Sequence, residues 1–114
     1  LKIDKLERLV ERLNILMHKF PRSSFKCDKL SEKVYDAFKG VGANPEIIEI
    51  TDTAGARYFI DDKGVRFSEY GFHRAVRVGD MVYDALTGTS GAQFSQYLNM
   101  LKGYGIDPAV KVIK

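Results

Sequence analysis

Residues 70–86 read YGFHRAVRVGDMVYDAL. Two runs rich in β-branched and aromatic residues flank the Gly79-Asp80 pair, and this arrangement predicts a β-hairpin with a tight turn at the pair. The hairpin is the most informative structural signal in the chain, and the other expected elements are placed around it.

The register of this hairpin determines which polar side chains meet. In the simplest register Val78 lies opposite Met81, and the ladder runs on to place Ala75 opposite Asp84. Side chains alternate between the two faces of a strand, so His73 and Asp84 become diagonal neighbours on one face. A shift of one residue would put them on opposite faces.

The rest of the chain alternates between helical and extended patterns. Amphipathic periodicity predicts helices over residues 3–20, over residues 25–38 and up to about residue 102. Ser24 is expected to cap the second helix, and the spacing of Ser90 and Gln93 matches a capping box for the third. Short strands between turn signals are expected at residues 47–50, 57–60 and 65–67, with an edge strand at 110–113.

These elements predict an α+β fold in which N-terminal helices pack on one side of an antiparallel β-sheet, with a C-terminal helix. The length of 114 residues suits a single domain, residues 1–114. Within it, residues 1–22 form the N-terminal amphipathic helix and residues 23–114 the core.

Composition narrows the class of protein. The chain has 45% hydrophobic residues, one cysteine and a net charge of +3. A single cysteine forms no internal disulfide, and it suits a reducing compartment. No signal peptide and no membrane-length apolar run occur, and the first residue is Leu, so we expect a piece of a longer polypeptide. The basic residues are interleaved with acidic ones, which favours a solvated face or an acidic protein partner over nucleic acid.

Cys27 is the lone cysteine, in the stretch Ser23-Ser24-Phe25-Lys26-Cys27-Asp28. If Ser24 is the N-cap, Phe25 is the first helical residue and Cys27 the third. Helix starts have unpaired N–H groups and a dipole that favours negative charge, which biases a thiol there towards thiolate. An unpaired cysteine is more often a small buried hydrophobe, so the catalytic interpretation depends on a histidine and a carboxylate presented together.

The hairpin supplies both groups. His73 would take the thiol proton of Cys27 and later deliver it to the leaving group, and Asp84 would fix the imidazole tautomer. The Cys27 backbone N–H is one expected oxyanion donor, while the sequence identifies no second donor. No metal-binding motif occurs, so no metal and no cofactor are assigned.

These residues also resemble a family. Phe25-Lys26-Cys27 opening a helix, then Gly71-Phe72-His73-Arg74-Ala75-Val76, Val82-Tyr83-Asp84 and Thr87-Gly88, are similar to the papain-fold toxin domains. Those domains end bacterial polymorphic toxins of the contact-dependent inhibition and Rhs types. The resemblance covers roughly residues 23–101. It implies a papain-like fold with Cys27 as nucleophile, His73 as base and Asp84 as the orienting residue. The glutamine that papain-like enzymes carry before the nucleophile is missing.

The resemblance implies a toxic effector domain, secreted as part of a larger effector. It would act in the target-cell cytoplasm and be neutralised in the producer by a cognate immunity protein. The chemistry would be thioester-forming attack on an amide of a target-cell protein, giving proteolysis, glutamine deamidation or transglutamination. The small body favours a side-chain amide. No nucleic acid and no membrane are expected as partners.

Two other interpretations stay open. The first is a basic toxin domain that acts on nucleic acid, with His73, Arg74 and Arg77 on phosphate and no need for Cys27. The second is a non-catalytic interaction module in which Cys27 is a core residue.

Overall fold

The computed structural model describes residues 2–114. Its helices are α1 (Lys2–Lys19), the short 3₁₀ helix η1 (Arg22–Ser24), α2 (Cys27–Gly40) and α3 (Phe94–Gly103). Its strands are β1 (Glu46–Asp52), β2 (Phe59–Ile60), β3 (Arg66–Ser68), β4 (Phe72–Val78), β5 (Met81–Tyr83), β6 (Ala92–Gln93) and β7 (Pro108–Val112). Across residues 2–114 no helix combines the length and the apolarity needed to cross a bilayer.

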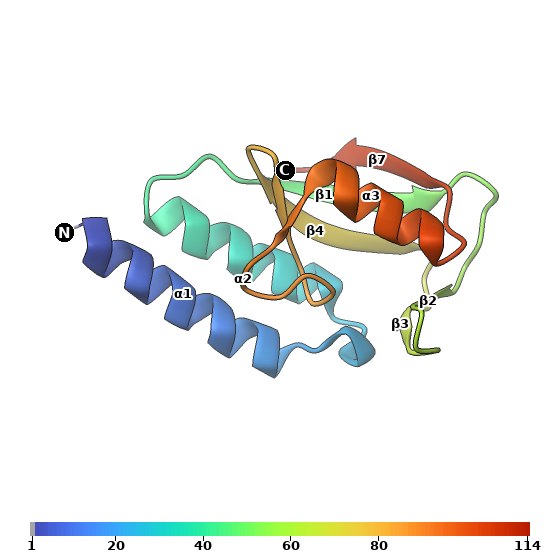
Figure 1. The fold of residues 1–114 in the computed structure, drawn as a ribbon, viewed down its shortest axis with the longest axis horizontal. Coiled ribbons are helices and arrows are strands. Elements are labelled where there is room, and N and C mark those ends of the chain that lie inside the picture. Colours follow the sequence, from blue (N-terminus) through green and yellow to red (C-terminus); the bar gives the residue numbers. More distant parts are fainter. Residues whose placement is uncertain (1) are drawn as a thin grey trace.

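Five strands form one antiparallel sheet in the order β6-β5-β4-β1-β7, while β2 and β3 form a separate two-stranded ribbon (Figure 1). β4 and β1 are interior strands and pair over their length, and β7 lies at the edge that the terminal apolar run predicts. The α+β class is therefore confirmed.

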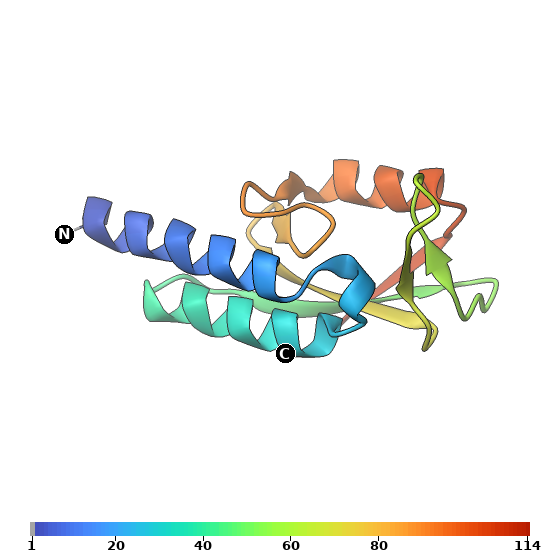
Figure 2. The ribbon, with the colours of Figure 1, turned by 90° about the horizontal axis from the view of Figure 1, so that it is seen from below.

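The two faces of the sheet carry separate cores. Ile47 and Val76 face α1 and α2, whereas the adjacent residues Ile48 and Ala75 face α3 and the β2–β3 ribbon. This switch follows from strand alternation, and it explains why the central strands are apolar on both sides. The N-terminal helices thus cover one face and α3 the other (Figure 2).

The hairpin has the register that the sequence predicts, with Val78 opposite Met81. The ladder ends at Val76 opposite Tyr83, so the expected pairing of Ala75 with Asp84 does not form. The chain turns away at Asp84, whose backbone N–H donates to the Thr87 hydroxyl oxygen at 3.0 Å instead of to a strand. β5 therefore does not cover the stretch of β4 that carries His73.

The expected start of the second helix is wrong. The helix begins at Cys27, which is its first residue and not its third, and Phe25 adopts a left-handed conformation with φ of 58°. Ser24 does not cap the helix, because it belongs to η1 and its hydroxyl donates to the Pro21 carbonyl at 2.7 Å. Serine side chains often prefer such a local backbone acceptor, and the propensity for capping does not distinguish the two.

The expected capping box is also wrong. Gln93 is the N-cap of α3 in an extended conformation, and no side chain caps the helix there. Ala92 and Gln93 instead pair with β5 as the short edge strand β6, and the Phe94 N–H donates to the Asp80 carbonyl at 2.8 Å. The main-chain acceptor takes the place of a side-chain cap.

Candidate active site

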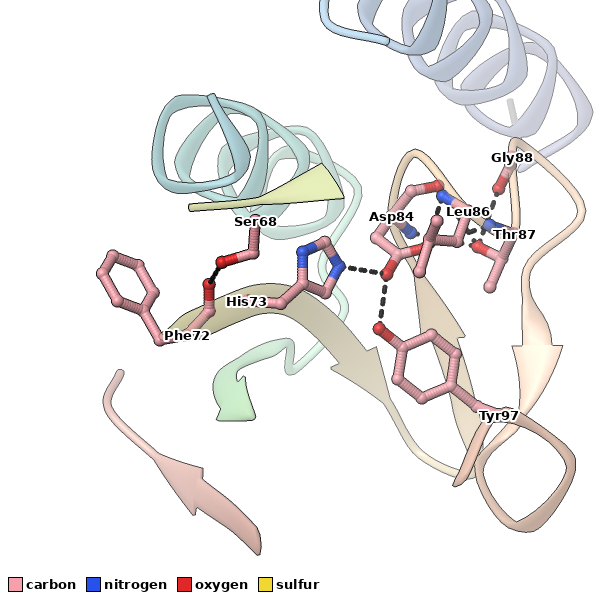
Figure 3. A network of polar contacts seen from close by, with 8 residues as sticks. All are labelled: Ser68, Phe72, His73, Asp84, Leu86, Thr87, Gly88 and Tyr97. Atoms are coloured by element: carbon pink, nitrogen blue, oxygen red, sulfur yellow. Dashed lines mark hydrogen bonds and ion pairs between the residues drawn. The ribbon is translucent and has the colours of Figure 1, made fainter. Parts of the chain in front are cut away.

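Asp84 lies at the end of β5 and is 2% exposed. Its Oδ1 accepts hydrogen bonds from the Leu86 and Thr87 N–H groups, both at 2.9 Å. Its Oδ2 contacts His73 Nε2 at 2.7 Å and accepts the Tyr97 hydroxyl proton (Figure 3). Burial would raise the pKa of this carboxyl, but the imidazole, the hydroxyl and the amide donors lower it below its ordinary value. Asp84 is thus held as a carboxylate.

His73 lies on β4, opposite Ile50 of β1, and is 2% exposed. The Phe67 ring meets the imidazole edge-on at nearly a right angle, with ring centroids 5.2 Å apart. The Ser68 hydroxyl donates to the Phe72 carbonyl at 2.6 Å and so joins β3 to the residue before His73 (Figure 3). These contacts, together with the bond to Asp84, leave the imidazole one orientation.

The second nitrogen of the ring has a different environment. Nδ1 is buried, and no described residue lies at the distance and angle of an ordinary hydrogen bond to it. In Figure 3 it points away from Asp84. His73 and Cys27 line one small cavity of about 10 Å³, closed by Phe67, Leu30 and Ala85. That space is too small for a ligand, and across it Cys27 lies near enough to the imidazole to influence its charge state.

The charge state of His73 follows from these neighbours. Burial would lower the pKa of the imidazole, but hydrogen bonding to Asp84 and to Cys27, with the negative charge of both, raises it from 6.5 to about 9. The imidazole is therefore protonated at neutral pH, held between the Asp84 carboxylate and the Cys27 sulfur.

Cys27 reaches this gap because it is the first residue of α2. It is half-buried, and the first helical bond runs from the Leu30 N–H to the Lys26 carbonyl at 2.9 Å. The N–H groups of residues 27–29 therefore have no acceptor within the helix. They point out of the helix start, where negative charge on the sulfur or on a bound carbonyl oxygen is favoured.

The outer side of Cys27 opens to solvent. A groove of about 580 Å³ is lined by Cys27 together with Ser24, Phe25, Lys26, Asp28, Lys29, Tyr70 and Phe72. The sulfur thus has a supported side towards His73 and an accessible side towards this groove. A nucleophile requires both.

The turn before Cys27 is built by Phe25. It is the one described residue other than glycine with a positive φ. An L-residue in this region costs about 1–2 kcal/mol, which surrounding contacts must offset. One such contact is the ion pair from Arg22 of η1 to the buried carboxylate of Asp61, which follows β2, at 2.8 Å.

The structure brings together all three residues that the sequence singled out. His73 and Asp84 are in direct contact, and Cys27 lines the same cavity as His73. Just before Cys27 in the chain, the Ser24 hydroxyl donates to the Pro21 carbonyl and the Arg22 guanidinium pairs with Asp61.

Sequence reasoning missed Tyr97. The helical period predicts it as a buried core residue, and it is fully buried. Its hydroxyl nevertheless reaches Asp84, and burial together with the carboxylate charge raises the pKa of Tyr97 well above its usual value, which keeps it a donor. A buried tyrosine needs a partner for its hydroxyl, but the sequence does not say which one.

Within residues 2–114 no group of three or more His, Cys, Asp or Glu side chains is placed to hold a metal ion. Comparison with known proteins adds no relative: no family model, no curated protein and no solved structure matches the chain.

Proposed function

We propose that this domain is a cysteine-dependent amide hydrolase or transferase with Cys27 as nucleophile, His73 as acid–base and Asp84 as the orienting carboxylate. One observation carries the proposal: buried His73 has one nitrogen on Asp84 and its unpaired nitrogen in the gap shared with Cys27. A buried histidine nitrogen normally has a hydrogen-bond partner, and Cys27 is the polar residue that lines the same gap and interacts with the imidazole.

In the first half of the reaction the Cys27 thiolate attacks the carbonyl carbon of an amide and a tetrahedral oxyanion forms. The N–H groups at the start of α2 are the donors nearest to that oxygen. The imidazolium of His73 gives its Nδ1 proton to the amide nitrogen, the C–N bond breaks, and ammonia or an amine leaves a thioester on Cys27.

In the second half neutral His73 takes a proton from water, and the resulting hydroxide attacks the thioester. The thiolate leaves and the imidazolium is restored, so one amide and one water give one acid and one amine. If an amine replaces water, the product is a new amide. Throughout, Asp84 keeps the Nε2–H in place and leaves Nδ1 as the nitrogen that exchanges protons.

The resemblance to papain-fold toxin domains gives this chemistry a biological setting. On that basis we propose a papain-like effector domain, delivered as part of a larger toxin, that modifies a protein in the cytoplasm of a target bacterium. A cognate immunity protein would protect the producing cell. The half-buried Cys27 and the open groove beside it support an external macromolecular substrate.

Growth of a bacterial host without an immunity protein tests the proposal. Wild type should arrest growth, whereas Cys27→Ala should not, because no thioester forms without the sulfur. Cys27→Ser serves as the matched control, since it keeps the size of the side chain and replaces a thiolate with a weak nucleophile. Both variants are checked for folding by thermal unfolding.

The outcome separates the alternative functions. Equal toxicity of wild type and Cys27→Ala would contradict the thiol mechanism and favour action on nucleic acid. If none of the proteins is toxic, a binding module is favoured. If wild type alone is toxic, intact-mass analysis of host proteins identifies the chemistry: an amide exchanged for an acid, a cross-link with loss of ammonia, or fragments.

A further inference from the structure

The groove beside Cys27 has a neighbouring surface hollow on two of its sides. A shallow hollow of about 520 Å³ adjoins it and shares Tyr70 as a wall, and another of about 420 Å³ shares Asp28 and Lys29. Cys27 therefore lies near the middle of a series of three surface hollows. A site for a small ligand surrounds it on most sides, whereas a shallow open channel suits a chain that passes through.

One wall of the central groove is aromatic. Tyr70 and Phe72 have ring centroids 6.4 Å apart, and Phe25 lines the same groove. Tyr70 is 63% exposed, so its ring is not used by the core. Exposed aromatic rings beside a reactive group provide contact area for an apolar side chain of a ligand.

The helix side of the groove is cationic. Lys26 and Lys29 are exposed, and neither has an ion-pair partner within residues 2–114. Asp28 is the single carboxylate among the groove residues, so on this side of the groove two lysine side chains are present for one carboxylate. The Arg74 guanidinium is less able to bind an acidic ligand residue, because the Glu49 carboxylate already pairs with it at 3.1 Å.

We propose that the groove binds an extended polypeptide segment of the target protein, with an apolar or aromatic side chain on Phe25, Tyr70 and Phe72 and an acidic residue beside Lys26 and Lys29. This inference rests on the proposed function, because it takes Cys27 as the nucleophile. It gives the small domain more room for a peptide than its length suggests, since the segment lies on the surface and needs no deep cleft.

Electrophilic peptides measure this recognition without knowledge of the natural target. The probes are short synthetic peptides whose central side chain carries a chloroacetamide, flanked by Phe and Glu in both orders. Reference peptides carry Ala at either or both flanks, or Lys in place of Glu. The rate of Cys27 alkylation by each peptide is divided by its rate with iodoacetamide, which does not fill the groove.

We expect one Phe and Glu order to react about tenfold faster than the Ala peptide after this normalisation. Tyr70→Ala should remove the advantage of Phe and keep that of Glu, and Lys29→Glu should reverse the preference to Lys. Tyr58→Ala and Lys5→Glu are matched controls, because both residues are exposed and lie outside the groove. They should leave all ratios unchanged.

The experiment distinguishes a failure of the groove proposal from a failure of the catalytic proposal. If iodoacetamide labels Cys27 faster than an ordinary thiol near neutral pH but all peptides react alike, the groove does not select this segment and the catalytic proposal stands. The same conclusion follows if Tyr70→Ala and Lys29→Glu change nothing. If iodoacetamide itself labels Cys27 no faster than an ordinary thiol, the proposed function fails together with this inference.

Discussion

At the scale of single residues, the site depends on how Asp84 divides its hydrogen bonds. Oδ1 is occupied by two backbone amides, and Oδ2 is shared by His73 and Tyr97. Each donor to a carboxylate withdraws some of the negative charge that the others meet. Tyr97 therefore moderates the attraction between Asp84 and the imidazolium, although it touches neither His73 nor Cys27 through a hydrogen bond. It is a positioning residue.

Replacing Tyr97 with Phe tests this role. Without the hydroxyl, Oδ2 interacts with the imidazolium alone, so the pKa of His73 should rise further above its value of about 9. Stability should fall by about 1–2 kcal/mol, because a buried hydrogen bond is lost. The His73 titration is followed by NMR of its ring protons.

Tyr83→Phe is the matched control, since this half-buried ring packs against Phe38 and is not among the donors to Asp84. It should leave the titration of His73 unchanged. If Tyr97→Phe lowers stability and leaves the titration where it was, then Tyr97 is a packing residue only.

At the scale of elements, the segment after β5 holds Asp84 in place. Gly88 and Gly91 both have positive φ, at 71° and 69°, and they return the chain from Asp84 to β6. Gly91 has a second constraint, because a Cβ there would lie 2.7 Å from the Tyr83 ring. The close approach of this backbone to β5 keeps the turn compact beside His73 and Asp84.

Replacing each glycine with alanine separates the cost of the left-handed backbone from the cost of the contact with Tyr83. Gly88→Ala should cost about 1 kcal/mol from the left-handed conformation alone, since a Cβ at this position would meet nothing within 4 Å. Gly91→Ala should cost about 2–4 kcal/mol, because the steric clash with Tyr83 adds to the same strain. Urea unfolding gives both free energies. Equal costs at the two positions would show that the contact with Tyr83 relaxes freely.

Several elements were predictable because their signals are local. The Gly79-Asp80 turn sets the register of the hairpin, whereas the contact between His73 and Asp84 forms just beyond the last pair of the ladder, where the chain turns at Asp84. The start of α2 was not predictable, because Ser24 can serve either as a helix cap or as a 3₁₀ residue bonded to Pro21. The partner of Tyr97 was not predictable either, since it depends on how α3 packs across the sheet.

At the scale of the whole molecule, the buried charges make stability depend on pH. The pKa of His73 is raised from 6.5 to about 9, so the folded protein keeps a proton that the unfolded chain releases above pH 6.5. The stabilisation from this proton is complete below pH 6.5 and is lost as the pH rises to about 9. The pKa of the Asp84 carboxyl is lowered, so its contribution is lost in acid, below about pH 4.

We therefore expect the free energy of unfolding of Cys27→Ala, in which no thiol proton enters the balance, to decline as the pH rises above 6.5. Chemical unfolding at a series of pH values measures the slope. His73→Gln should remove the decline in that window, whatever its effect on absolute stability, because the titrating group is gone. A Cys27→Ala curve that stays flat above pH 6.5 would contradict the buried imidazolium, whereas a flatter wild-type curve is expected if Cys27 gives up its proton on folding.

The left-handed conformation of Phe25 sets stability against the lining of the groove. Selection for stability alone would favour glycine at a φ of 58°, because glycine adopts it without steric penalty. A phenylalanine there accepts that penalty and places an aromatic ring on the groove beside the thiol. Under the proposed function, stability and recognition thus favour different residues at position 25.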